Sequence, residues 1–225
     1  RNNRRPCLAA NRGERIMEKL QQLKGVAAPL PRANIDTDII TPMKYLTSAT
    51  PDNLHDHTFE PLRFMADGSE NPDFILNKPG YRDSVILIAG RNFGCGSSRE
   101  TAVWGIKGMG IRCVIAESFG DIFFNNCFQN SVLPIRLPAE VVADLMAEAG
   151  DDQGNTQFQV DVAARTLTTP SGRSITFDLT PDRQTALLEG LDDIGQTMKE
   201  DAETAAFQDK DRTARPWIYE LGTID

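Results

Sequence analysis

The residues that could do chemistry gather in one stretch, 91–100, with the sequence RNFGCGSSRE. Gly94 and Gly96 allow the backbone to take positive φ angles or to approach a ligand closely. Two hydroxyls and a guanidinium follow, from Ser97, Ser98 and Arg99. If a helix begins here, its free N–H groups and the positive end of its dipole also favour an anion. The stretch therefore indicates a site for a carboxylate or a phosphate.

The same residues also fit a helix N-terminus with no catalytic role. Ser97 to Glu100 have the pattern S-x-x-E of a capping box, and such caps are common where helices begin. Two phosphate-binding motifs are excluded, because no Gly-Lys-Ser/Thr follows and because Arg99 stands where a dinucleotide fingerprint needs its last glycine. The spacing alone leaves both a cap and an anion site open.

The other reactive side chains form weaker patterns. The cysteines are Cys7, Cys95, Cys113 and Cys127. They lack a CxxC pair and match no common iron–sulfur spacing, so we expect this chain by itself to bind neither a cluster nor another metal. They also form no disulfide framework, so we expect the protein to be located in the reducing cytoplasm. Cys95 is interpreted as a small residue in a tight turn rather than as a reactive thiol. His55 and His57 form an H-x-H pair in a polar segment, where we expect surface positions rather than metal ligands.

Composition excludes several other classes of protein. Of the 225 residues 40% are hydrophobic and 25% are charged, which is ordinary for a soluble globular protein. The longest apolar run, Val85–Ala89, is too short to cross a bilayer. The net charge of -8 and the pI of about 4.9 are unlike those of general nucleic-acid or anionic-membrane binders, so we expect neither kind of partner.

The elements that must position the glycine-rich stretch have the pattern of a parallel sheet. SVILIAG (84–90) is a continuous apolar run of the kind found in strands buried on both faces, and CVIA (113–116) and VLPI (132–135) are two more. Helical patterns lie between them, over 98–109 and over 121–128, and we expect the phenylalanines of the second helix in the core. Alternating strands and helices of this kind predict an α/β fold around a parallel sheet.

Less regular segments flank this sheet. Residues 51–80 contain four prolines and predict a long loop with a short helix near 62–66. Further on, FQVDV, LTT and SITFDL predict antiparallel strands with a turn at Ser171-Gly172. Residues 182–200 predict an amphipathic helix. We expect one domain over 17–225 and a disordered or non-native leader over 1–16, for which a transit peptide is the alternative.

Four stretches together resemble a known family: NIDTDIITP, NFGCGSSRE, IRCVIAESFGDIFFNNCF and RPWIYE. They are similar to the small subunits of bacterial 3-isopropylmalate dehydratases, within the aconitase family, from about Met17 to the C-terminus. The resemblance implies a swivelling β/β/α domain with a parallel-sheet core and an antiparallel annex. It also implies a large-subunit partner that carries a [4Fe-4S] cluster, and a small dicarboxylate substrate. The implied reaction isomerises 2-isopropylmalate and 3-isopropylmalate through 2-isopropylmaleate in leucine biosynthesis.

The resemblance implies a role for each matching residue. Ser97 matches the serine that, as an alkoxide, abstracts a proton from substrate carbon, and a site rich in donors and positive charge is needed for that role. Arg99 matches the arginine that grips a substrate carboxylate, for which its planar fork is suited. Ser98 matches a substrate-contacting serine. Asp38 matches an active-site aspartate, and an ordinary Asx turn is the alternative for it and for Asp36.

Two features bear on the choice of substrate. Tyr45, Leu46 and Thr47 fall in the loop that, in related small subunits, separates isopropylmalate from longer or more polar substrates; an anchored surface loop is the alternative. Thr101 stands where many relatives have a histidine after SSRE, so a related dehydratase acting on homoaconitate or methylmalate remains open. From another class, a stand-alone carboxylate- or anion-binding module is the remaining alternative.

Overall fold

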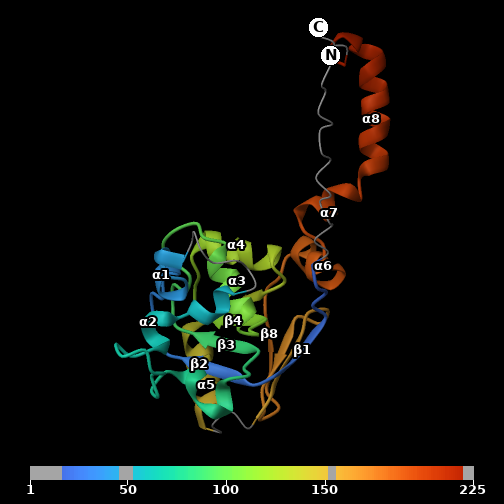
Figure 1. Ribbon diagram of the computed structural model, residues 1–225. Helices are drawn as coiled ribbons and strands as arrows, with labels where there is room; N and C mark the ends of the chain where they lie inside the picture. Colours follow the sequence, from blue (N-terminus) through green and yellow to red (C-terminus); the bar gives the residue numbers. More distant parts are fainter. Residues whose placement is uncertain (1–16, 46–52, 152–155, 220–225) are drawn as a thin grey trace, which may run out of the picture.

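The computed structural model describes residues 17–45, 53–151 and 156–219 (Figure 1). Within these ranges the chain forms two four-stranded sheets, with the strand orders β2-β3-β4-β5 and β1-β6-β7-β8. All pairs in the first sheet are parallel and all pairs in the second are antiparallel. The predicted combination of a parallel core with an antiparallel annex is confirmed. The leader predicted over 1–16 lies outside the described residues.

The parallel sheet carries the site. Its strands are β2 (Ala27–Leu30), β3 (Ile86–Ala89), β4 (Cys113–Ala116) and β5 (Leu133–Arg136). Every residue of β3 and β4 is buried, because these central strands are covered on both faces, and this explains their continuous apolar runs. The sequence predicted β3, β4 and β5 but not β2, whose Pro29 is tolerated because the strand lies at the edge of the sheet.

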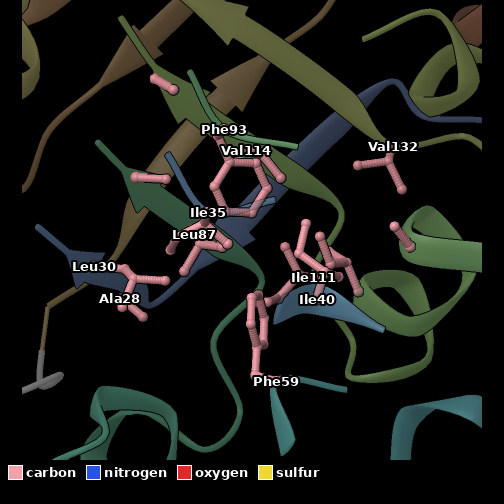
Figure 2. Close-up of a cluster of buried hydrophobic side chains, with 14 of the residues drawn as sticks. Ala28, Leu30, Ile35, Ile40, Phe59, Leu87, Phe93, Ile111, Val114 and Val132 are labelled. Atoms are coloured by element: carbon pink, nitrogen blue, oxygen red, sulfur yellow. The ribbon is translucent and has the colours of Figure 1, made fainter. Parts of the chain in front are cut away.

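Three helices of the described ranges pack around the parallel sheet, and they are longer than the helices between β2 and β3. They are α3 (Thr101–Gly108), α4 (Asp121–Gln129) and α5 (Ala139–Asp151). Side chains of α3 and α4 share one core layer with Leu87 and Val114, and Figure 2 shows Ile40, Phe59 and Phe93 in the same layer. On the opposite face, Ile86 and its neighbours pack with α5 and with the antiparallel sheet. The parallel sheet is therefore the middle layer of three.

The antiparallel sheet joins the start of the chain to its later part. Its strands are β1 (Gln22–Gly25), β6 (Phe158–Asp161), β7 (Thr166–Thr168) and β8 (Ser174–Thr176). The last three were predicted, and Gly172 forms the turn between β7 and β8 with a φ of +87°. β1 was not predicted, because its pairing with β6 joins residues that are far apart in the sequence.

Short helices fill the segments between β2 and β3. They are α1 (Thr37–Ile40), η1 (Met43–Tyr45), η2 (Leu54–His57), α2 (Glu60–Arg63), η3 (Ile75–Asn77) and η4 (Pro79–Tyr81). The short helix predicted near 62–66 lies at 60–63 instead. It begins after Phe59, whose φ of 57° is left-handed, and it ends at the extended residue Phe64.

The C-terminal part contains α6 (Pro181–Glu189), α7 (Asp193–Met198), α8 (Asp201–Ala214) and η5 (Pro216–Ile218). The single helix predicted over 182–200 is wrong. Gly190, with a φ of 71°, ends α6, and the Asp192 side chain caps α7 by accepting the Gly195 N–H at 2.7 Å. None of the helices in the described ranges is long and apolar enough to cross a membrane.

Candidate active site

The carboxyl ends of the parallel strands bring the predicted residues together. The segments after β2 and β3 remain side by side beyond the strands, where the Gly94 N–H donates to the Ile35 carbonyl at 2.7 Å and the Thr37 N–H donates to the Cys95 carbonyl at 2.9 Å. DTDII therefore lies next to GCGSS, although some sixty residues separate them in the sequence. Ligands of open α/β sheets bind at this edge.

The glycine turn is closely packed. Gly94 has a φ of +69°, and a Cβ added there would lie 2.2 Å from Cγ of Phe123 on α4. On the neighbouring loop, a Cβ on Gly120 would lie 2.5 Å from the Gly94 carbonyl oxygen. These approaches require glycine at both positions, so the backbone that leads into Ser97 is held in a fixed place.

The helix after the turn begins later than predicted. α3 begins at Thr101 rather than at Ser98, and its N-cap residue Glu100 makes no capping hydrogen bond with its side chain. The Glu100 carboxylate instead accepts a bond from Nδ2 of Asn130 at 2.9 Å. The capping-box interpretation is therefore wrong. Gly96, with a φ of +97°, and the turn between the Arg99 N–H and the Ser97 carbonyl delay the helix.

Because α3 begins late, the serines stand in an open segment. Ser97 and Ser98 are both exposed. Among the described residues, no acceptor pairs with the backbone N–H groups of Gly96, Ser97 or Ser98. Free N–H groups on successive residues form a concave donor surface that suits an anion. The segment therefore offers two hydroxyls and several amide donors to a ligand.

Arg99 and Asp38 form a two-pronged ion pair at this edge. Nη1 of Arg99 lies 2.5 Å from Oδ1 of Asp38, and Nη2 lies 3.1 Å from Oδ2. The Arg99 hydrogen bond lowers the pKa of Asp38 below its ordinary value of 3.8, with a further contribution from the Met43 backbone N–H. The Arg99 side chain is 10% exposed and that of Asp38 is 50% exposed. The cation is thus the buried partner and the carboxylate is the one open to solvent.

Asp36 and Asp38 have different roles in the structure. Oδ1 of Asp36 accepts the Ile39 N–H at 2.7 Å and so caps α1. Asp38 lies in the first turn of the same helix, and its carboxylate is directed to Arg99. The Asp36 side chain therefore has a local structural role, as a helix cap rather than the predicted Asx turn, whereas the Asp38 side chain binds a distant residue.

The guanidinium of Arg99 has donors to spare. Besides its bonds to Asp38, Nη2 lies 3.4 Å from Oγ of Ser97. A guanidinium has five N–H donors, so two remain without a partner among the described residues. A positive charge beside a hydroxyl favours the ionised hydroxyl, and the free donors can bind a carboxylate. The Ser97 hydroxyl and the free guanidinium donors therefore lie side by side, joined by the Arg99–Ser97 hydrogen bond.

The predicted specificity segment is described only at Tyr45, because Leu46 and Thr47 lie outside the described residues. The Tyr45 ring stacks on His57 with the centroids 3.7 Å apart and the planes 7° from parallel. Nζ of Lys44 lies 2.7 Å from Oε1 of Glu60. These contacts fix the end of η1 against η2 and α2.

The H-x-H pair is half-buried rather than fully at the surface. His57 is covered by Tyr45, and a Cβ added to Gly108 would lie 2.8 Å from Cβ of His55, so η2 packs closely on α3. Among the described residues, no group of three or more His, Cys, Asp or Glu side chains could hold a metal ion.

The described cysteines and phenylalanines have structural positions. Burial, with the nearby charge of Asp36, raises the pKa of the Cys95 thiol, which supports its interpretation as a packing residue in the turn. Cys113 and Cys127 are fully buried, and burial raises their pKa values as well. Phe123 and Phe128 lie in the core, as predicted, and Phe124 packs against it half-buried.

Comparisons with known proteins agree with this geometry. The family model for the aconitase C-terminal domain matches residues 17–140, and the model named LeuD_N matches residues 143–181. The chain is 51% identical over 202 residues to the 3-isopropylmalate dehydratase small subunit of Paramagnetospirillum magneticum, covering 90% of this chain and all of that protein. The chain belongs to the family of 3-isopropylmalate dehydratase small subunits. It is also 51% identical over 201 residues to the small subunit of Rhodospirillum centenum, covering 89% of this chain and 98% of that protein.

A solved member of the same family confirms the fold. The crystal structure of 3-isopropylmalate dehydratase from Methanocaldococcus jannaschii is 26% identical, with a TM-score of 0.57 over 82% of this chain and 98% of that chain. The predicted aconitase-type domain is therefore right.

One contact beside the site, the bond from Asn130 to Glu100, was not predicted from the sequence. It has no local signal, because its partners meet only after α4 packs on α3. Thr101, the residue after SSRE, carries a buried hydroxyl that has no hydrogen-bond partner among the described residues.

Proposed function

We propose that this chain is the small subunit of a 3-isopropylmalate dehydratase, a hydro-lyase of leucine biosynthesis that acts in the cytoplasm. The observation that carries the proposal is the arrangement of Arg99, which reaches both Asp38 and the Ser97 hydroxyl at the edge of the parallel sheet. The family relationship supports the reaction. We propose that the whole of 17–225 acts as one domain in this role.

Ser97 is proposed as the base. A serine hydroxyl is a poor base unless its ionised form is stabilised, and the guanidinium 3.4 Å away supplies positive charge for that purpose. The alkoxide removes a proton from one substrate carbon, and the hydroxyl group leaves the neighbouring carbon. These losses give 2-isopropylmaleate, the neutral Ser97 hydroxyl, which now holds the proton, and hydroxide. Addition of hydroxide in the opposite sense, with return of the proton from Ser97, gives the isomer and restores the alkoxide.

Arg99 and Ser98 are proposed to bind the substrate. An isopropylmalate carries two carboxylates, and one of them must be held so that the correct carbon faces Ser97. The two free guanidinium donors, the Ser98 hydroxyl and the unpaired N–H groups of the turn can hold that carboxylate. Asp38 orients the guanidinium, because its two oxygens bind both terminal nitrogens.

A large subunit is proposed to supply the [4Fe-4S] cluster. The described residues do not fit such a group, because Cys113 and Cys127 are fully buried and Cys95 is enclosed in the glycine turn. When bound to the large subunit, the cluster would act as a Lewis acid toward the substrate hydroxyl. This chain would then contribute the base and the carboxylate grip.

Reconstitution tests the proposal. The chain is mixed with a cluster-loaded large subunit, and isomerisation is measured for 2-isopropylmalate, methylmalate and homoaconitate. We expect turnover only in the mixture and highest with isopropylmalate. Faster turnover of another malate would assign the chain to a related dehydratase. Carboxylate binding by the chain alone, with no activity in any mixture, would favour the stand-alone module.

A further inference from the structure

The last described segment, residues 201–219, extends away from the body of the molecule, and we call it the C-terminal arm (Figure 1). It comprises α8, η5 and Tyr219. Neither α8 nor η5 buries any of the residues that the structure describes in them. A helix of fourteen residues is only marginally stable in water without tertiary packing. The arm therefore has the properties of an element that is completed by another molecule.

The arm presents large apolar side chains to solvent. Phe207 is 63% exposed, Trp217 is 61% exposed and Ile218 is 43% exposed. Phe207 and Ala214 are seven residues apart, so they lie on one face of α8. Trp217 and Ile218 follow directly in η5. Tryptophan is among the residues that most often dominate the binding energy of protein interfaces.

The tip of the arm is held in a defined shape. The Asp211 carboxylate accepts a bond from the Tyr219 hydroxyl at 3.0 Å and another from Nε of Arg215 at 2.6 Å. Arg212 lies over the Tyr219 ring, 5.0 Å from its centroid. These contacts fold η5 against the end of α8 while Trp217 remains exposed. An anchor that is ordered before binding loses less conformational entropy on association.

We propose that the C-terminal arm docks on the large subunit of the dehydratase, with Trp217 and Phe207 as its anchors. This inference rests on the proposed function, in which the carboxyl edge of the parallel sheet must face the subunit that carries the cluster. In Figure 1, α8 rises from the side of the body where α6 and α7 lie to beyond the level of α1 and α4, and α1 carries Asp38. A large subunit seated over that edge and extending toward α6 and α7 would meet the arm.

Binding measurements test the inference. Titration calorimetry compares the wild-type chain with Trp217→Ala and Phe207→Ala against a large subunit that reconstitutes activity with the wild type. We expect the Kd to rise at least tenfold for Trp217→Ala. The matched control is Gln208→Ala, an exposed polar position on the same helix, for which we expect the wild-type Kd. Asp211→Asn, which removes the charge that holds the tip, should weaken binding in the same direction but less.

Activity separates this inference from the proposed function. If the arm docks on the large subunit, the activity that Trp217→Ala loses returns as the large subunit is titrated in, because Ser97 and Arg99 are intact. Wild-type Kd values for both Trp217→Ala and Phe207→Ala would overturn the inference and leave the proposed function standing. A loss of self-association of the isolated chain, with unchanged binding of the large subunit, would also overturn it and assign the arm to a second copy. No activity of the wild-type chain with any large subunit would overturn the proposed function itself.

Discussion

Arg99 and Asp38 are 61 positions apart in the sequence, yet each terminal nitrogen of the guanidinium donates to one oxygen of the carboxylate. The pair forms because the segments after β2 and β3 continue side by side beyond the sheet. The arginine is held largely buried while the carboxylate is half exposed. The orientation of the guanidinium is therefore fixed by Asp38 in the structure without a ligand.

The first prediction concerns the geometry of this grip. Arg99→Lys keeps the charge but loses the two-pronged fork, so one substrate carboxylate is held less firmly. Charge-assisted hydrogen bonds are worth about 1.5 to 3 kcal/mol, so kcat/KM should fall roughly ten- to a hundredfold. Steady-state kinetics of the reconstituted enzyme measure the change.

Arg173→Lys is the matched control for Arg99→Lys. Arg173 binds Asp144 through one contact of 2.9 Å, and the two side chains are 46% and 63% exposed. Such pairs contribute roughly 0 to 1 kcal/mol, so this variant should keep wild-type kinetics. Wild-type kcat/KM in Arg99→Lys would remove Arg99 from the site.

The second prediction separates the chemistry of Ser97 from its structural role. Since Ser97 does not cap α3, Ser97→Ala should change the free energy of unfolding by no more than about 0.5 kcal/mol. Loss of a general base should lower kcat roughly 10²- to 10⁴-fold. Urea unfolding and kinetics on the same preparation give both values, with the exposed Ser174→Ala as the control. Near-normal turnover would show that another group is the base.

The sequence predicted the parallel core because its central strands are buried on both faces and so read as unbroken apolar runs. It did not predict β2 or β1. β2 is a four-residue edge strand containing Pro29, and β1 is defined by its pairing with a distant strand. The helix predicted over 182–200 failed at Gly190, whose left-handed conformation ends α6.

The candidate site residues were predicted through the family resemblance, whereas their contacts were not. The S-x-x-E pattern around Ser97 suits a capping box, but the positive φ of Gly96 displaces the start of the helix to Thr101. Likewise, nothing local distinguishes Asp36 from Asp38. Only when α1 packs against the segment after β3 does their difference emerge, because Asp36 then caps the helix and Asp38 binds Arg99.

The third prediction uses the lowered pKa of Asp38. A carboxyl whose pKa is lower in the folded state stabilises the fold above its unfolded pKa, and this contribution disappears as the pH falls through the folded pKa. Asp38→Asn should therefore be less stable than the wild type near pH 6, and the difference should shrink as the pH falls below the ordinary value of 3.8 and vanish below the lowered pKa of Asp38. Because Asp38 is half exposed, the difference should not exceed about 1 kcal/mol. Urea unfolding at a series of pH values measures it, and a difference that does not shrink as the pH falls below 3.8 would contradict the role of the charge.

The fourth prediction tests the close packing that positions Ser97. Gly94→Ala places a Cβ 2.2 Å from Cγ of Phe123 at a φ of +69°. Overpacking costs roughly 1 to 3 kcal/mol and the left-handed conformation costs about 1 to 2 more, so the variant should lose roughly 2 to 5 kcal/mol. Gly172→Ala is the matched control, because its φ is +87° and no neighbouring atom lies within 4 Å of the added Cβ. Gly172→Ala should therefore lose only the stability that the left-handed conformation costs, about 1 to 2 kcal/mol.

The double variant Gly94→Ala/Phe123→Ala shows whether the ring causes the extra loss. Removing the ring makes room for the methyl group, so the two changes should destabilise the fold less together than the sum of their separate effects. The double variant should also regain part of the reconstituted activity that Gly94→Ala loses. Removing the ring relieves the clash, so the backbone before Ser97 can return to its wild-type position. Equal destabilisation by Gly94→Ala and Gly172→Ala, with additive effects in the double variant, would mean that Phe123 does not constrain the turn.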